Sequence, residues 1–327
     1  MRPQRFFAGG CRTPFPAHGG RSCEGLVVSE KASAKKPALH GRYGEWWQTA
    51  PSFGWLLFFF AVPTVLIIIM SFRPAGDYGG FAKGWSLKAW IELGHPSYPM
   101  IVWRTIWLSL VATVICIGMG LPVGYLLGRA EPKFRAVLLL LVVVPFWTNF
   151  LIRVYAWKVL LHPAGFLRHF LISIGVIGDD TLLLYNEWAV LLVMVYAYVP
   201  FAILPIYAAA EKFDFSLMDA ARDLGASSIQ AFWLVFVPGV QRGLMAAVVM
   251  VLIPSLGSYV IPELVGGPAG EMIGNKIAQR VFVDRNWPHA AALATLLMLV
   301  TLLPVAFAYL QGRRESVPSG EKKGGRP

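Results

Sequence analysis

Residues Ser216–Pro238 read SLMDAARDLGASSIQAFWLVFVP and form a polar stretch between two long apolar segments of the chain. Two serines in it, Ser216 and Ser227, are each followed three residues later by an acid or an amide. This spacing is typical of a capping box at the start of a helix, and Gly225 between them fits the left-handed residue that ends one. The stretch therefore predicts two short helices joined by a sharp turn, which is either a docking element or an ordinary interfacial hairpin.

The sequence on both sides of this stretch is that of a membrane protein. Of its 327 residues 56% are hydrophobic and 14% charged, whereas a typical soluble domain has about 25% charged residues. About 20 consecutive apolar residues cross the hydrocarbon core of a bilayer. The sequence predicts an all-α integral membrane protein with six transmembrane helices, at about residues 53–72, 105–127, 136–157, 188–210, 244–261 and 289–310.

The basic residues predict on which side of the membrane each loop lies. With a cytosolic N-terminus, 19 Lys and Arg fall in inside segments and 10 in outside segments, as the positive-inside rule favours. Eight of the 19 lie before the first span, and without them the split is 11 to 10. We expect a disordered cytoplasmic tail over 1–45, a membrane domain over 46–312 with a cytoplasmic loop at 211–243, and a second cytoplasmic tail over 313–327.

The composition of the spans narrows the function. Each predicted span contains proline, and apart from Arg153 near the end of the third, none contains an Asp, Glu, Lys or Arg between its ends. Prolines kink helices that line a path, although they are also common in membrane helices generally. Proton-coupled carriers usually need intramembrane carboxylates, whereas sodium coupling through backbone carbonyls does not. The chain lacks a G-x-x-x-x-G-K-[ST] phosphate loop, so an active transporter would take its energy from another subunit.

The polar stretch resembles the cytoplasmic EAA loop of ABC importer permeases, whose pattern is Glu-Ala-Ala, three residues, Gly, nine residues, Ile-x-Leu-Pro. Here Asp219, Ala220, Ala221 and Gly225 stand at the first positions and Val235-Phe-Val-Pro238 at the last, with Asp for Glu and Val for Ile and Leu. The resemblance implies the importer-permease (MetI-like) fold, a five-helix core plus one N-terminal helix. It also implies that an ATPase subunit docks on Ser216, Asp219, Ala220, Ala221, Gly225 and Pro238.

Further motifs resemble the spermidine/putrescine group of these permeases: PFWTNFLIRVYAW at 145–157, YVPFAILP at 198–205, PELVGG at 262–267, IGNKI at 273–277 and NWP at 286–288. The likeness covers residues 50–312. It implies a bacterial inner-membrane complex with a second permease (the same or a different chain), two ATPase subunits that bind ATP and Mg, and a periplasmic solute-binding protein. This chain would hold no cofactor and perform no bond chemistry. The resemblance favours a polyamine as the transported solute. Ferric iron, thiamine and other organic cations remain alternatives, because neighbouring branches of the permease family share much of the pattern.

A polycationic solute needs carboxylates and aromatic faces along its path, because each cation–π contact contributes roughly 0.5–2 kcal/mol. Candidates at the outer ends of the spans are Trp147, Tyr155, Tyr259, Glu263, Asp284 and Trp287. Glu263 is the first of these, since it follows the fifth span directly and precedes two glycines. Aromatic residues also anchor helices at membrane interfaces, and Asp284 beside Arg285 and near Arg280 has the alternative of a surface ion pair.

Two other classes of protein stay open at this stage. An ion-coupled secondary carrier would transport its solute without an ATPase. A membrane enzyme or assembly factor has less support, since the sequence shows no cluster of His, Asp and Glu, and His162 and His289 lack the spacing of metal ligands. The net charge of +11 is distributed along the membrane edges and does not favour nucleic-acid binding.

Overall fold

The computed structural model describes residues 42–315 except 77–78, 176 and 179–180. It divides into two compact units, Met1–Leu56 and Leu57–Pro327. Almost all of the predicted tail 1–45 and most of the tail 313–327 lie outside the described residues. Helices are the only regular elements within them, apart from a single bridge between Ala75 and Phe81, so the predicted all-α class is confirmed for this part of the chain.

Three helices in the described part are long and apolar enough to cross a membrane, and two bent pairs raise the number to five if each pair is one span. The three lie in α1 (Arg42–Met70), α3 (Ser97–Arg129) and α7 (Glu187–Ala210). The last helix, α13 (Trp287–Glu315), contributes a shorter apolar segment, Trp287–Leu302. The structure thus supports the first, second and fourth predicted spans directly, and the number six stays a prediction.

The third predicted span is not one continuous helix. It consists of α4 (Pro132–Val143), the 3-10 turn η1 (Val144–Trp147) and α5 (Phe150–Leu160), with a bend of 83° between the two halves. Thr148 is extended, and the Asn149 side chain then caps α5 by accepting a hydrogen bond of 2.8 Å from the Leu151 amide. An asparagine cap starts a new helix, and this local signal overrides the continuity of the apolar run.

The core of the second unit is formed by α3, α7 and α11 (Gln241–Leu256), which pack against one another. On α3, glycines at every fourth position, Gly120, Gly124 and Gly128, face Ala202, Ile206 and Ala210 of α7. A Cβ atom at Gly124 would lie 2.6 Å from Ile206 Cγ2. Small residues at this spacing let two membrane helices approach closely, so this contact depends on the glycines.

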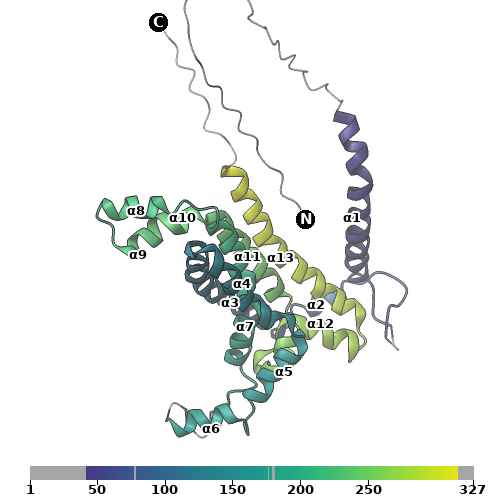
Figure 1. The fold of residues 1–327 in the computed structure, drawn as a ribbon. Coiled ribbons are helices and arrows are strands. Elements are labelled where there is room, and N and C mark those ends of the chain that lie inside the picture. Colours follow the sequence, from purple (N-terminus) through teal and green to yellow (C-terminus); the bar gives the residue numbers. More distant parts are fainter. Residues whose placement is uncertain (1–41, 77–78, 176, 179–180, 316–327) are drawn as a thin grey trace, which may run out of the picture. The chain divides into compact units, whose positions relative to one another are not determined.

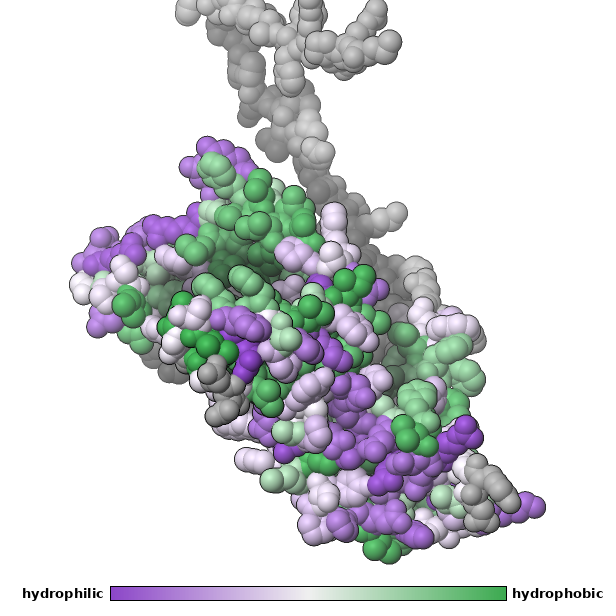
Figure 2. Space-filling model, turned by 90° about the horizontal axis from the view of Figure 1, so that it is seen from below, coloured by the Kyte–Doolittle hydropathy of each residue, from purple (hydrophilic) through white to green (hydrophobic). Residues whose placement is uncertain are grey.

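Several short elements of the second unit lie at its two ends (Figure 1). At one end, toward which the C-terminal part of α13 also runs, α8 (Ser216–Asp223), α9 (Ser228–Ala231) and α10 (Val237–Gly239) project away from the other helices. At the opposite end lie α2 (Lys88–Glu92), α5, α6 (Phe166–Ser173) and α12 (Ile273–Phe282). Figure 2 shows the molecule from below, where hydrophilic side chains form a broad band between apolar patches.

The fifth predicted span ends earlier than expected. The sequence predicts 244–261, whereas α11 ends at Leu256 and is followed, after a short break, by the π-helix η3 (Pro262–Gly266) and the 3-10 helix η4 (Pro268–Gly270). At its start, α11 is bent by 75° from the segment Ser228–Gly239. The helix therefore runs from the projecting hairpin at one end of the unit toward η3 at the other.

Candidate functional site

The first candidate site is the polar hairpin, residues 211–243. Its helices α8 and α9 are joined by a turn at Gly225, and α9 continues through the π-helix η2 (Phe232–Phe236) into α10. The predicted order of helix, glycine turn and helix is therefore confirmed. The exposed Pro238 lies at the start of α10, shortly before the 75° bend into α11.

The turn of the polar hairpin is a Schellman motif. Gly225 has φ +93° and its amide donates to the Arg222 carbonyl at 2.9 Å, while the Ala226 amide donates to the Ala221 carbonyl at 3.1 Å. These two bonds satisfy carbonyls that the end of a helix otherwise leaves unpaired. The motif requires a left-handed backbone conformation at Gly225. The fixed turn holds α8 and α9 in one relative orientation.

The two predicted capping boxes have different outcomes. Ser227 and Gln230 form theirs: the Gln230 amide donates to Ser227 Oγ at 3.3 Å and the Ser227 amide donates to Gln230 Oε1 at 2.9 Å. Ser216 does not cap α8, which corrects the prediction. It is the first helical residue, and Asp214 Oδ1 accepts from its amide at 3.0 Å instead. Hydrogen bonds from the side chain and backbone of Ser216 hold the pKa of Asp214 below its usual value.

A cluster of aromatic rings fixes the polar hairpin to the membrane helices. Phe236 is fully buried, and its ring centroid lies 5.1 Å from that of Tyr125 on α3, 5.4 Å from Phe213 and 5.3 Å from Phe232. Phe215 also packs edge-on against the Tyr125 ring. Aromatic pairs in this geometry stabilise beyond their buried area. The hairpin is thereby anchored by its base, an arrangement that was not predicted from the sequence.

The tip of the polar hairpin presents apolar surface. Leu224 is 90% exposed, and Leu217 and Ile229 are also exposed, whereas Met218 on the opposite side of α8 is buried. Asp219 and Ala220 are exposed and Ala221 is half-buried. The exposed residues of the tip thus remain accessible, while the base of the hairpin is packed against the membrane helices. The hairpin is therefore suited to bind another protein.

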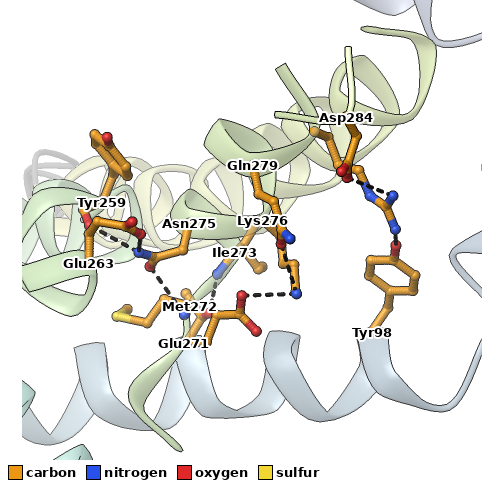
Figure 3. A network of polar contacts seen from close by, with 12 residues as sticks. Tyr98, Tyr259, Glu263, Glu271, Met272, Ile273, Asn275, Lys276, Gln279 and Asp284 are labelled. Atoms are coloured by element: carbon orange, nitrogen blue, oxygen red, sulfur yellow. Dashed lines mark hydrogen bonds and ion pairs between the residues drawn. The ribbon is translucent and has the colours of Figure 1, made fainter. Parts of the chain in front are cut away.

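The second candidate site lies at the opposite end of the unit, where η3 faces α12 (Figure 3). Glu263 Oε2 accepts a hydrogen bond of 2.7 Å from Asn275 Nδ2. The same amide nitrogen donates to the Tyr259 carbonyl at 3.3 Å, and Asn275 Oδ1 accepts from the Met272 amide at 3.3 Å. Asn275 is thus held on three sides, and it orients the Glu263 carboxylate.

A second carboxylate belongs to the same site. Glu271 Oε1 forms an ion pair with Lys276 Nζ at 2.9 Å, and Lys276 Nζ also donates to Gln279 Oε1 at 3.0 Å. Two adjoining cavities of about 360 and 370 Å³ share four lining residues, Glu263, Glu271, Asn275 and Gln279. We call Tyr259, Glu263, Glu271, Asn275, Lys276 and Gln279 the Glu263 site. Its carboxylates and cavities suit a small organic cation.

The structure brings together only two of the six predicted path residues, Tyr259 and Glu263. Asp284 Oδ2 instead pairs with Arg280 Nη1 at 2.8 Å, which is the ion pair that the sequence offered as an alternative. The Trp287 ring packs edge-on against Phe81. Two predicted path residues on the broken third span, Trp147 and Tyr155, are both exposed.

Four members of the site were not predicted from the sequence: Glu271, Asn275, Lys276 and Gln279. Asn275 and Lys276 lie in the motif IGNKI at 273–277, which was used only for resemblance. The contact of Asn275 with Glu263 joins residues twelve apart on two different elements. The motif IGNKI was therefore the one sequence signal for these residues. The role of Asn275 is seen only in the structure, where α12 faces η3.

The packed apolar helices, the anchored hairpin at one end and the polar cavities at the other define a membrane transport subunit. The chain belongs to the family of binding-protein-dependent transport system inner membrane components, whose model matches residues 120–316. This membership supports an inner-membrane location and a transport role. It argues against the ion-coupled carrier and the membrane enzyme that the sequence had left open.

Two relatives and one solved structure are close to the chain. It is 37% identical over 262 residues to the spermidine/putrescine transport system permease protein PotB of Haemophilus influenzae. The aligned region covers 80% of this chain and 91% of that protein. It is 35% identical over 247 residues to the protein of the same name from Escherichia coli K12, covering 76% and 90% of the two chains. A bacterial ABC transporter involved in the import of the acidic polysaccharide alginate matches with a TM-score of 0.66 and 17% identity, over 84% of this chain and 96% of that one. The importer-permease fold is thus confirmed in its all-helical class and overall likeness, while the six-span arrangement stays a prediction.

Proposed function

We propose that this chain is the membrane-spanning permease subunit of an ATP-driven importer of polyamines, with spermidine and putrescine as solutes. The observation that carries this proposal is the 37% identity to a spermidine/putrescine permease along 91% of that protein's length. The Glu263 site supports the same solute class, because two carboxylates line its cavities. A polyamine presents flexible ammonium groups that such carboxylates bind. Ferric iron, thiamine and other organic cations are the alternative solutes.

We infer six spans in the bacterial inner membrane, formed by α1, α3, the bent α4–α5 pair, α7, α11 and α13, with both termini in the cytoplasm. In this arrangement the polar hairpin faces the cytoplasm. The basic loop at 129–135 supports this side, since Arg135 Nη1 pairs with Glu211 Oε1 at 3.0 Å and so lies at the base of the hairpin. Basic residues are concentrated on the cytoplasmic side of membrane proteins. The Glu263 site then lies at the periplasmic end.

The partners follow from this orientation. An ATPase subunit binds the tip of the polar hairpin, where Asp219, Ala220 and Leu224 are exposed. ATP and Mg are bound and hydrolysed on a pair of such subunits and not on this chain. A second permease completes the path, and a periplasmic solute-binding protein delivers the polyamine to the end that carries the Glu263 site. Lipid surrounds the exposed apolar faces of the spans.

In the transport cycle, the ATPase moves the polar hairpin as it closes on ATP. The Schellman turn and the aromatic cluster make the hairpin a rigid handle, so its displacement passes to α3 through Tyr125 and to α11 through the bend at 239–241. The path then opens toward the periplasm, and Glu263 binds an ammonium group of the solute. Hydrolysis of ATP returns the path to its cytoplasmic opening and the solute leaves.

The test is uptake of radiolabelled spermidine into proteoliposomes. One preparation holds the complete transporter with its solute-binding protein outside and ATP inside; the other holds this chain alone with proton and sodium gradients. We expect ATP-dependent uptake in the first and none in the second. Uptake by the chain alone would overturn the permease assignment, and ATP-driven uptake of thiamine or ferric iron but not of spermidine would replace the solute.

A further inference from the structure

We propose that Lys276 acts as a stand-in for the solute: in the empty permease its ammonium group occupies the position on Glu271 that an ammonium group of the polyamine takes during transport. The solute therefore displaces Lys276 from Glu271 when it enters the site, and Lys276 returns when the solute leaves. This inference rests on the proposed function, because it assumes that the Glu263 site receives an organic polycation.

The contacts of Lys276 are those expected of a bound alkylammonium ion. Its Nζ lies 2.9 Å from Glu271 Oε1 and 3.0 Å from Gln279 Oε1, one charged and one neutral acceptor. A lysine side chain is a primary ammonium on a methylene chain, which is also the chemistry of the two ends of a polyamine. The side chains of Lys276 and Glu271 are 22% and 27% exposed. The pair is therefore shielded, yet open enough for exchange with a competing cation.

The displacement of Lys276 changes the net charge that the site offers to a solute. Both carboxylates line the two adjoining cavities, but only Glu271 has a cation beside it among the described residues. Glu263 is held by the neutral amide of Asn275. With Lys276 in place the site has one uncompensated negative charge, and with Lys276 displaced it has two. Two carboxylates match the two terminal ammonium groups of a diamine.

The displaced side chain has room to move. Lys276 also lines a neighbouring cavity of about 660 Å³, on the side of α12 that faces Tyr98 and the start of α3. Glu92 and Arg280 both lie on the wall of that cavity, and each already has a partner: Glu92 contacts His289 Nδ1 at 3.1 Å and Arg280 pairs with Asp284 at 2.8 Å. Because lysine has a flexible four-carbon stem, its ammonium group can leave Glu271 for this cavity without a movement of the backbone.

A tethered cation of this kind has two consequences for transport. Monovalent cations meet a neutralised Glu271 in the empty permease, so the site favours a solute that brings more than one charge. Return of Lys276 also competes with the bound solute and hastens its release. Lys276 is in this sense a specificity-determining residue, and Glu271 is the ligand that it shares with the solute.

The test measures binding of radiolabelled spermidine by equilibrium dialysis to the purified complex of permeases and ATPases, without the solute-binding protein. Lys276→Met removes the competing ammonium at nearly constant length. We expect it to bind spermidine about tenfold more tightly than the wild type, which corresponds to roughly 1.4 kcal/mol. Lys276→Arg keeps the cation and is expected to resemble the wild type. Lys83→Met, which removes the same charge from the segment before α2, is the matched control and is expected to change nothing.

A purely structural salt bridge gives a different pattern, because its loss does not tighten the binding of a solute. Adding Glu271→Gln to Lys276→Met is expected to abolish the gain. The inference is overturned if Lys276→Met, or Lys276→Gln should the methionine variant not assemble, binds spermidine no more tightly than the wild type. It is also overturned if the gain survives Glu271→Gln. Uptake by the wild-type transporter, measured in parallel, separates these outcomes from a failure of the proposed solute.

Discussion

Substitution of Gly225 tests whether the polar hairpin transmits force. Gly225 adopts φ +93°, and a Cβ atom built at this position meets no atom within 4 Å. An alanine here is therefore penalised only by its backbone conformation and not by a clash. A left-handed conformation costs an L-residue roughly 1–2 kcal/mol, which lowers the population of the folded turn by a factor of roughly 5–30.

Proline at the same position removes the turn altogether. Its ring fixes φ near −65°, and it lacks the amide that in Gly225 donates to the Arg222 carbonyl at 2.9 Å. We expect Gly225→Ala to reduce solute-stimulated ATP hydrolysis and uptake by the complete transporter up to about tenfold, within the range of that population change. Gly225→Pro is expected to abolish both, with the chain still inserted in the membrane.

The chain offers a matched control in Gly175, which follows α6 at the opposite end of the unit. Gly175 has φ +72°, its amide donates to the Ile172 carbonyl at 2.9 Å, and its Cβ position is also empty. Gly175→Ala therefore carries the same backbone penalty away from the polar hairpin and is expected to leave ATP hydrolysis unchanged. If Gly225→Pro kept wild-type stimulated hydrolysis and uptake, or if both alanine variants lost hydrolysis equally, the turn would have no part in coupling.

Three further substitutions probe packing, docking and the solute site. Gly124→Ala places a Cβ atom 2.6 Å from a side chain of α7 and is expected to destabilise the chain by about 1–3 kcal/mol, seen as a lower melting temperature of the complex. Gly118→Ala in the same helix meets nothing within 4 Å, and equal melting of both variants would contradict the close contact. Leu224→Ser exposes no core and is expected to weaken binding of the ATPase subunit by roughly 1.5–3 kcal/mol in a pull-down titration at unchanged melting; unaltered affinity would remove the tip from the interface. Glu263→Gln is expected to lower spermidine uptake at least tenfold while Asp284→Asn lowers it little, and the reverse order would place the solute near Asp284.

Local signals in the sequence were sufficient to predict the polar hairpin. Its second capping box and its glycine turn are satisfied by bonds between residues at most five positions apart. The error at Ser216 has a local cause as well. Asp214 and Ser216 are both good capping residues, and a two-residue change of register decides between them. In the structure the Asp214 side chain accepts from the Ser216 amide just before the helix, and Ser216 is the first residue inside α8.

The bend in the third span could not be predicted from hydropathy. An apolar run sets the length of a span, and residues 136–157 are long enough to pass as one helix. The break depends on Asn149, whose side chain starts α5 with a hydrogen bond of 2.8 Å to the Leu151 amide. A single polar residue scarcely alters the mean hydropathy of a span, yet the axis turns by 83° there.

The Glu263 site was only half predictable for a related reason. Glu263 itself stood out because it follows the apolar run of the fifth span and precedes two glycines. Its hydrogen-bond partner Asn275 comes from α12, which lies between the fifth and sixth predicted spans. The contact of the Ile273 amide with Thr105 Oγ1, at 2.9 Å, spans 168 positions and docks α12 on α3. Long-range contacts of this kind leave no periodic trace in a single sequence.

The physical connection between the two sites is α11 and its packing against α7. At its first turn, a Cβ atom at Gly243 would lie 2.6 Å from the Pro205 carbonyl oxygen, and near its last turn Tyr198 Oη donates to the Pro254 carbonyl at 3.3 Å. Held to α7 at both ends, a helix of 16 residues moves as a rod of about 24 Å. We expect a tilt imposed at the bend after Gly239 to pass along α11 toward η3, where Glu263 faces Asn275. Because α12 is docked on α3 through the Ile273–Thr105 contact, such a tilt is expected to change the contact between Glu263 and Asn275.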